Sequence, residues 1–163
     1  LAGLTLQACA TTTPVANDPP VDPAAFAWSQ AEGSNIIAGD ALLRTRGGEV
    51  RTCAGLDVKL IPSTPYTDAF VARVYPGGYR PLDYVFQTRP QMDPAALPFV
   101  QSKRCNAQGE FSFSQLPDGP YYVVATVTWE APGYGGYMTP QGGEIAQPVQ
   151  VAGGRTETIT LTK

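Results

Sequence analysis

The chain has 163 residues and a mass of 17.3 kDa, which is enough for one folded domain with a short appendage. Hydrophobic residues make up 43% of it and charged residues 15%, and its 17 glycines and 16 prolines favour turns, so neither a disordered nor a mainly helical chain is expected. The net charge of −3 argues against a nucleic-acid partner, and the absence of histidine excludes an imidazole base or metal ligand.

The sequence begins with a short apolar run that ends at a cysteine. Residues 1–8 are typical of the end of a bacterial signal peptide, and eight residues are too few to span a bilayer. The sequence Leu6-Gln7-Ala8-Cys9 is similar to a bacterial lipobox. It predicts a covalent diacylglycerol and acyl chain on Cys9, which together anchor a protein stably in a membrane. The alternative is a free thiol on a frayed end.

The segment after this cysteine has the composition of a tether. Residues 9–23 are rich in Thr, Pro, Asn and Asp, which predicts a flexible connection between the lipid and the domain. Because Ala10 rather than aspartate follows the cysteine, the resemblance to enteric lipoproteins implies the outer membrane, with the domain facing the periplasm or the cell surface. No cofactor other than the lipid is expected.

A short helix or linker is expected over residues 24–35. Asp22 suits the N-cap, Pro23 suits the first turn, and alanines follow before a glycine ends the segment. Phe26 and Trp28 of this segment are expected to plug one end of a sheet.

The remaining residues, 36–163, have the patterns of a β domain. Segments 36–45 and 56–62 are strand-like and bracketed by turn residues. Residues 70–75 have an ambiguous period and predict either a further strand or a short helical arm. Residues 75–98 form a long insertion rich in Pro, Gly and Tyr, and insertions of this size are commonly functional.

The clearest strand pattern lies in residues 110–129. Residues 110–113 predict a strand, a Pro-Gly turn follows, and residues 121–129 predict a long strand with its heavier face, which includes Tyr121 and Trp129, toward the core. Residues 148–162 predict two strands joined by a turn. About seven short strands with one long insertion indicate an all-β sandwich.

Three cysteines leave two for pairing if Cys9 carries lipid. Cys53 and Cys105 then most simply form a disulfide in an exported protein. Closing a loop of about 50 residues would stabilise the fold by roughly 4 kcal/mol in the chain-entropy model. The alternatives are two buried thiols or a redox pair, although neither cysteine lies in a CxxC motif.

Segments 39–66, 105–123 and 149–162 resemble the carboxypeptidase regulatory-like domains of the transthyretin-like (prealbumin) group. The motif G-x-F-x-F-x-x-L-P-x-G-x-Y, from Gly109 to Tyr121, carries most of this resemblance. It implies a transthyretin-like or Ig-like β-sandwich that accompanies a partner and performs no chemistry. Catalytic relatives on similar sandwiches use histidines, which this chain lacks, so no catalytic residue is assigned.

Two groups of side chains are candidate binding residues. Tyrosine, tryptophan and arginine dominate binding hot spots, and aromatic rings also stack on sugar faces. The alternative is that these rings pack over the edge of the sandwich. The candidates are Tyr75, Tyr79, Arg80, Tyr84 and Arg89 in the insertion, and Trp129, Tyr134, Tyr137 and Met138 in the segment after the long strand.

These features predict a non-catalytic envelope lipoprotein that serves as an accessory or structural subunit and contacts a larger envelope protein. The alternative is a carbohydrate- or peptidoglycan-binding module that uses exposed aromatic loops. An enzyme is the least favoured class. The carboxylates are scattered without calcium-loop spacing, so no metal site is assigned.

Overall fold

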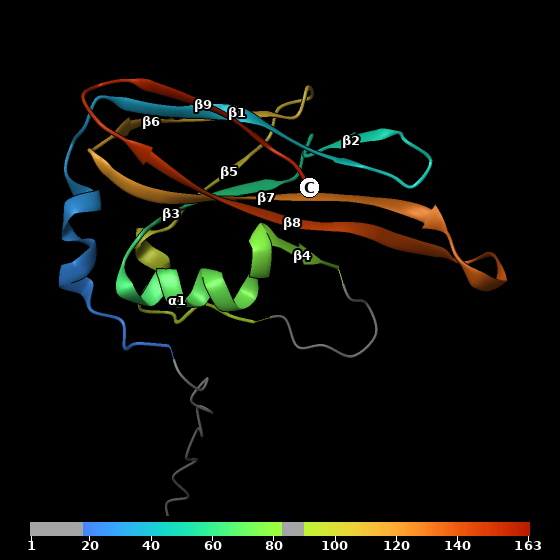
Figure 1. The fold of residues 1–163 in the computed structure, drawn as a ribbon, viewed down its shortest axis with the longest axis horizontal. Coiled ribbons are helices and arrows are strands. Elements are labelled where there is room, and N and C mark those ends of the chain that lie inside the picture. The colour runs from blue at the N-terminus through green and yellow to red at the C-terminus, as the bar shows by residue number, and fades with distance from the viewer. Residues whose placement is uncertain (1–17, 83–89) are drawn as a thin grey trace, which may run out of the picture.

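The computed structural model describes residues 18–82 and 90–163, which form two packed β-sheets with one α-helix on the outer face of the larger sheet (Figure 1). Nine strands occur in this part of the chain, so the predicted all-β sandwich is confirmed with two strands more than expected. The lipobox-like segment with Cys9 lies outside the described residues.

The smaller sheet is built around β1 (Asn35–Arg44). β6 (Glu110–Leu116) and then β2 (Val50–Thr52) pair antiparallel with one side of β1, and β9 (Thr156–Leu161) pairs parallel with the other side. The two strands expected in 148–162 are therefore present, but they do not pair as a hairpin, because the second one crosses to the smaller sheet.

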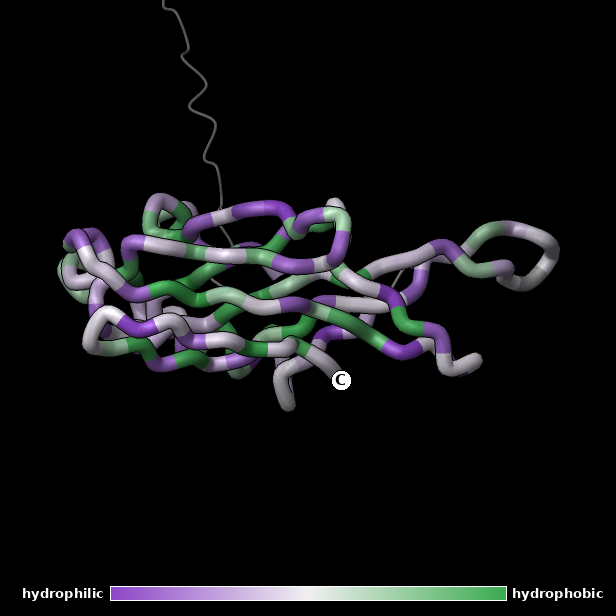
Figure 2. The backbone as a smooth tube through the Cα atoms, turned by 90° about the horizontal axis from the view of Figure 1, so that it is seen from above, coloured by the Kyte–Doolittle hydropathy of each residue, from purple (hydrophilic) through white to green (hydrophobic). Residues whose placement is uncertain are grey.

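The larger sheet is antiparallel throughout. Its strand order is β4 (Tyr79–Pro81), β8 (Met138–Val151), β7 (Gly119–Pro132), β3 (Asp57–Pro62) and β5 (Gln101–Arg104). β7 and β8 each have fourteen residues and pair over their whole length, so the hairpin extends beyond the smaller sheet at one end (Figures 1 and 2). Sequence patterns missed residues 138–147 of β8, where glycine and polar residues interrupt the alternation.

Helix α1 (Pro65–Val74) resolves the ambiguous period of residues 70–75 in favour of a helix. Thr64 caps it in a reciprocal arrangement with Thr67, and Pro65 occupies the first turn. Phe70 and its buried neighbours face the larger sheet. No helix in the described ranges is long and apolar enough to cross a membrane.

Short 3₁₀ helices close the loops around this core. The helix expected over 24–35 is the 3₁₀ helix η1 (Pro23–Gln30), which is shorter than predicted and begins with Asp22 accepting from the Ala24 amide at 2.9 Å. The others are η2 (Pro76–Gly78), η3 (Leu97–Phe99) and η4 (Tyr134–Gly136).

Of the two aromatic residues expected to plug an end of the sheet, Trp28 packs against the core between the sheets, whereas Phe26 belongs to the second core under α1. Phe26 is fully buried and stacks on Phe99 of η3, with ring centroids 4.4 Å apart. Trp28 packs edge-on against Tyr121 at 5.1 Å, and a Cβ at Gly119 would lie 2.2 Å from the Trp28 ring. Glycine at the start of β7 is therefore required by the tryptophan packed against it.

β7 separates two hydrophobic cores. Tyr121, Val123, Ala125 and Val127 point between the sheets, as predicted for the heavier face. The opposite face is also buried, because Val124 and its neighbours pack under α1 in a second core. Burial on both sides explains why this strand is almost continuously apolar.

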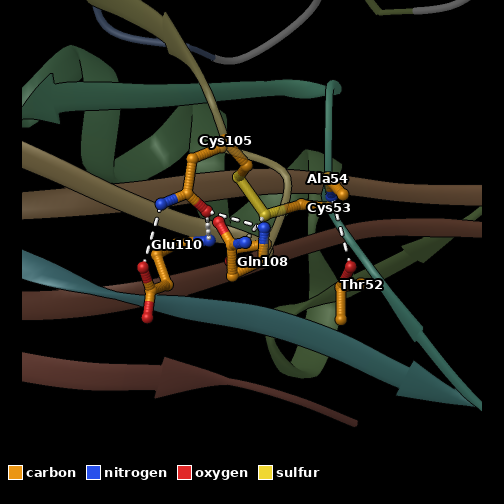
Figure 3. Close-up of a disulfide and its surroundings, with 8 residues drawn as sticks. Thr52, Cys53, Ala54, Cys105, Gln108 and Glu110 are labelled. Atoms are coloured by element: carbon orange, nitrogen blue, oxygen red, sulfur yellow. Dashed lines mark hydrogen bonds between the residues drawn. A yellow bond between two sulfur atoms is a disulfide. The ribbon is translucent and has the colours of Figure 1, made fainter.

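The predicted disulfide joins Cys53 and Cys105 (Figure 3). Cys53 follows β2 of the smaller sheet and Cys105 follows β5 of the larger one, so the bond links the two sheets. The surrounding backbone is ordered, because the Cys53 amide donates to the Ala41 carbonyl and the Cys105 amide donates to the Leu56 carbonyl, each at 3.0 Å.

A buried asparagine connects three segments at the opposite end. The Asn35 side-chain amide donates to the Leu116 carbonyl at 2.9 Å and to the Asp118 carboxylate at 2.8 Å, and its oxygen accepts from the Arg155 amide. The Gly153 amide also donates to Asp118. These hydrogen bonds, with the one from Asn35 foremost, lower the pKa of Asp118 from its ordinary value of 3.8.

We expect the double variant Cys53→Ala/Cys105→Ala to lose about 4 kcal/mol of unfolding free energy, because the unfolded chain regains the entropy of a loop closed over 52 residues. Urea denaturation measures this loss, and reduced wild-type protein is the control. A loss below about 1 kcal/mol would show that the bond adds little to the pairing of the sheets.

We expect Asp118→Asn to destabilise the protein at neutral pH, because an amide oxygen accepts the same hydrogen bonds more weakly than a carboxylate. Since the folded pKa of Asp118 is depressed, its stabilisation is present above the unfolded value of 3.8 and is lost as the pH falls through the folded value. Denaturation curves at several pH values should show the gap between variant and wild type closing in acid. A gap that persists unchanged at the lowest pH would contradict this assignment.

Candidate functional site

A groove lies where the β7–β8 hairpin extends beyond the smaller sheet. Its volume is about 750 Å³. One wall is formed by residues 43–47, at the end of β1 and in the turn toward β2. The other is formed by β4 and the outer halves of β7 and β8, with Lys163 also in the lining.

Two aromatic rings flank the β8 part of the groove. Tyr79 of β4 pairs in register with Ile145, and Trp129 of β7 pairs with Gln141, so the rings come from the strands on either side of β8. Both side chains are half-buried and pack against the core between the sheets, which places them on the same inner face.

Two glycines of β8 allow these rings to lie close to the backbone. A Cβ at Gly143 would stand 2.8 Å from the Tyr79 ring and 2.3 Å from the Arg80 carbonyl oxygen. A Cβ at Gly142 would stand 3.0 Å from the Trp129 ring, and the φ of +101° at this residue also favours glycine. Gly142 lines the groove, and Gly143 beside it lies against the Tyr79 ring, so the two glycines let both rings pack on the backbone of β8.

The Tyr79 hydroxyl is held in place. It donates to the Gly142 carbonyl at 3.1 Å. Burial raises the pKa of Tyr79, so the phenol stays protonated at neutral pH. This hydrogen bond holds the Tyr79 ring beside Gly142.

The opposite wall is polar and cationic. Arg44 is the last residue of β1, and Arg46 follows in the turn. Thr45 orders this turn, because its amide donates to the Glu49 carbonyl at 2.9 Å and its hydroxyl accepts from the Glu49 amide at 3.1 Å. The residues that line the groove include Arg44, Arg46 and Lys163 but no aspartate or glutamate. Gln141 adds an exposed amide.

The structure brings together Tyr79 and Trp129, which belong to different candidate groups in the sequence. Sequence reasoning did not select Arg44, Arg46, Gln141 or Lys163. The Arg-Gly-Gly turn after a strand was a signal for the two arginines, since hairpin turns present their flanking side chains.

Tyr75 and Arg80 lie on the other face of the larger sheet. Tyr75 is 9% exposed and belongs to the core under α1, where its hydroxyl donates to Glu144 at 3.4 Å. Arg80 Nη1 lies 3.8 Å from the same carboxylate. The two-residue period of a strand explains why Arg80 faces away from the groove while Tyr79 faces into it.

The remaining candidates lie elsewhere. Tyr137 and Met138 are 78% and 57% exposed at the tip of the β7–β8 hairpin, and Tyr134 belongs to η4 in the same tip. Tyr84 and Arg89 fall outside the described residues.

Comparison with solved structures finds a "putative carbohydrate binding protein" of Pseudomonas aeruginosa with a TM-score of 0.76 and 27% sequence identity. The match covers 90% of this chain and 100% of that protein. No family model and no curated protein matches the sequence.

We expect Gly143→Ala to destabilise the fold by about 1–3 kcal/mol, the usual cost of overpacking. The added methyl group meets the Arg80 carbonyl and the Tyr79 ring, so β4 or the ring must shift. Thermal denaturation and near-UV circular dichroism measure both effects. Gly47→Ala is the matched control, because the nearest atom to its new methyl would be the Thr45 hydroxyl at 3.7 Å. Equal stability of the two variants would show that β4 and the Tyr79 ring are not tightly packed against Gly143.

Proposed function

We propose that this domain binds carbohydrate in the groove between the β1–β2 turn and the projecting β7–β8 hairpin. The observation that carries the proposal is the pair of aromatic side chains, Tyr79 and Trp129, on one inner face beside Gly142 of β8. Aromatic rings attract the C–H faces of pyranose sugars and bury them from water. The solved structure that resembles this chain supports the same function.

The groove offers the complementary polar groups. Sugar hydroxyls project from the ring edge, and when a sugar stacks on an aromatic ring these hydroxyls point to the sides. Gln141 on one side and the arginines of the turn on the other supply the donors for them. The volume of about 750 Å³ lies within the usual range for small-ligand sites, roughly 300–1,000 Å³. We therefore expect an oligosaccharide segment rather than a single sugar.

A second proposed role is the docking of a larger envelope protein at the hairpin tip. Tyr137 and Met138 are exposed there, and the tip projects far from the sandwich (Figure 2). Such a role agrees with the accessory-subunit prediction, and a lipid on Cys9 would place the domain beside a membrane partner. Both the lipid anchor and the outer-membrane location remain predictions.

The proposed binding is measured best by the fluorescence of Trp129. The chain has two tryptophans, so Trp28→Phe leaves Trp129 as the only reporter. We expect an oligosaccharide selected on a glycan array to change this emission saturably, because a stacked sugar displaces water from the indole. Calorimetry with wild-type protein should give the same affinity.

The groove is tested by substitution. We expect Trp129→Ala and Tyr79→Ala each to weaken binding about tenfold, since a stacking contact contributes roughly 0.5–1.5 kcal/mol beyond the apolar area that it buries. Tyr137→Ala removes an exposed ring outside the groove and should leave the affinity unchanged. Thermal denaturation establishes that each variant is folded. Loss of binding in Tyr137→Ala alone, or no glycan bound by wild-type protein, would overturn the proposal.

A further inference from the structure

We infer that the groove selects glycans that carry carboxylates, such as polymers of uronic acids, and that Arg44 and Arg46 provide this selection. The inference rests on the proposed carbohydrate-binding function. The inference concerns the charge of the bound sugar and depends on the arginines. The proposed carbohydrate binding depends on Tyr79 and Trp129.

The charge in the groove differs in sign from the charge of the chain. The chain carries a net charge of −3, but the residues that line the groove include two arginines and a lysine and no aspartate or glutamate. The attraction for an anion is therefore local to this site. At physiological ionic strength charges beyond about 8 Å are largely screened, so the nearby cations dominate what a bound ligand experiences.

The two arginines differ from most other arginines in the protein by lacking an acidic partner. Neither Arg44 nor Arg46 forms an ion pair or a side-chain hydrogen bond within residues 18–82 and 90–163. Four other arginines lie within 4 Å of a carboxylate: Arg51 beside Glu49, Arg73 beside Asp18, Arg80 beside Glu144 and Arg104 beside Asp57. Lys163 is partly engaged, because its ammonium donates to the Gly77 carbonyl at 3.3 Å.

The geometry of a stacked sugar directs a carboxylate toward this wall. In a uronic acid the carboxylate is attached at the edge of the pyranose ring. When the ring face rests on Trp129 or Tyr79, that edge points toward a side of the groove. Arg44 at the end of β1 and Arg46 in the following turn line one such side, and hydrogen bonds between Thr45 and Glu49 order this turn. A guanidinium matches a carboxylate with two parallel hydrogen bonds, which a neutral hydroxymethyl group does not accept.

The inference is tested with polygalacturonate and its fully methyl-esterified form, which share a backbone and differ in charge. We expect the acidic polymer to bind wild-type protein about tenfold more tightly, the gain typical of a charge-assisted hydrogen bond, and to lose this advantage in high salt. Arg44→Gln/Arg46→Gln should remove the preference, so that the variant binds the acidic polymer and its methyl ester with equal affinity.

Arg104→Gln/Arg155→Gln is the matched control, because it changes the net charge equally at exposed sites outside the groove. This variant should keep the preference. Equal binding of the two polymers by wild-type protein, or an equal loss of preference in the control, would overturn the inference. If neutral glycans bind through Trp129 without any preference for acid, only the inference fails. If wild-type protein binds no glycan at all, the proposed function fails as well.

Discussion

The unequal length of the two sheets is the constraint on which the site depends. β7 and β8 pair over fourteen residues each, while the smaller sheet covers only part of their inner face (Figure 1). Under that cover the inward residues of β7 are fully buried. At Trp129 the cover ends, and the same face of the strand carries a ring that is only half-buried. Continuous backbone pairing therefore extends a core-facing surface into solvent, where it becomes available to a ligand.

The sequence predicted those parts of the fold that depend on neighbouring residues in the chain, such as turns and alternating strand patterns. The turn glycines and inward aromatic residues of the segment from Gly109 to Tyr121 predicted paired strands. The expectation of export, with Cys9 reserved for a lipid, left Cys53 and Cys105 as the predicted pair, and they are bonded. The fate of β9 was not predictable in this way. Its alternation fits a hairpin with β8 as well as it fits a parallel pairing with β1, and only tertiary packing distinguishes them.

The site was predictable only in part, for a related reason. Aromatic residue types identified Tyr79 and Trp129 as candidates, but a one-residue step along β4 separates Tyr79 in the groove from Arg80 on the helix side. Without the strand register, both looked equally suitable. Arg44 and Arg46 line a groove only because the β7–β8 hairpin, which is far away in sequence, forms its opposite wall. Long-range pairing creates such a site, so short-range patterns do not contain it.

The disulfide bears on the groove as well as on stability. The wall that contains Arg44 and Arg46 consists of the end of β1 and the turn toward β2. β2 has only three residues, and its one strand partner in the described part of the chain is the last three residues of β1. A strand this short supplies few hydrogen bonds to fix its position. Directly after it, Cys53 is bonded to Cys105 of the larger sheet, which also contains Tyr79 and Trp129. The covalent link thus ties the cationic wall to the sheet that carries the aromatic wall. A groove held at fixed width loses less conformational entropy when a ligand enters, which is how a site without a large apolar cavity gains affinity.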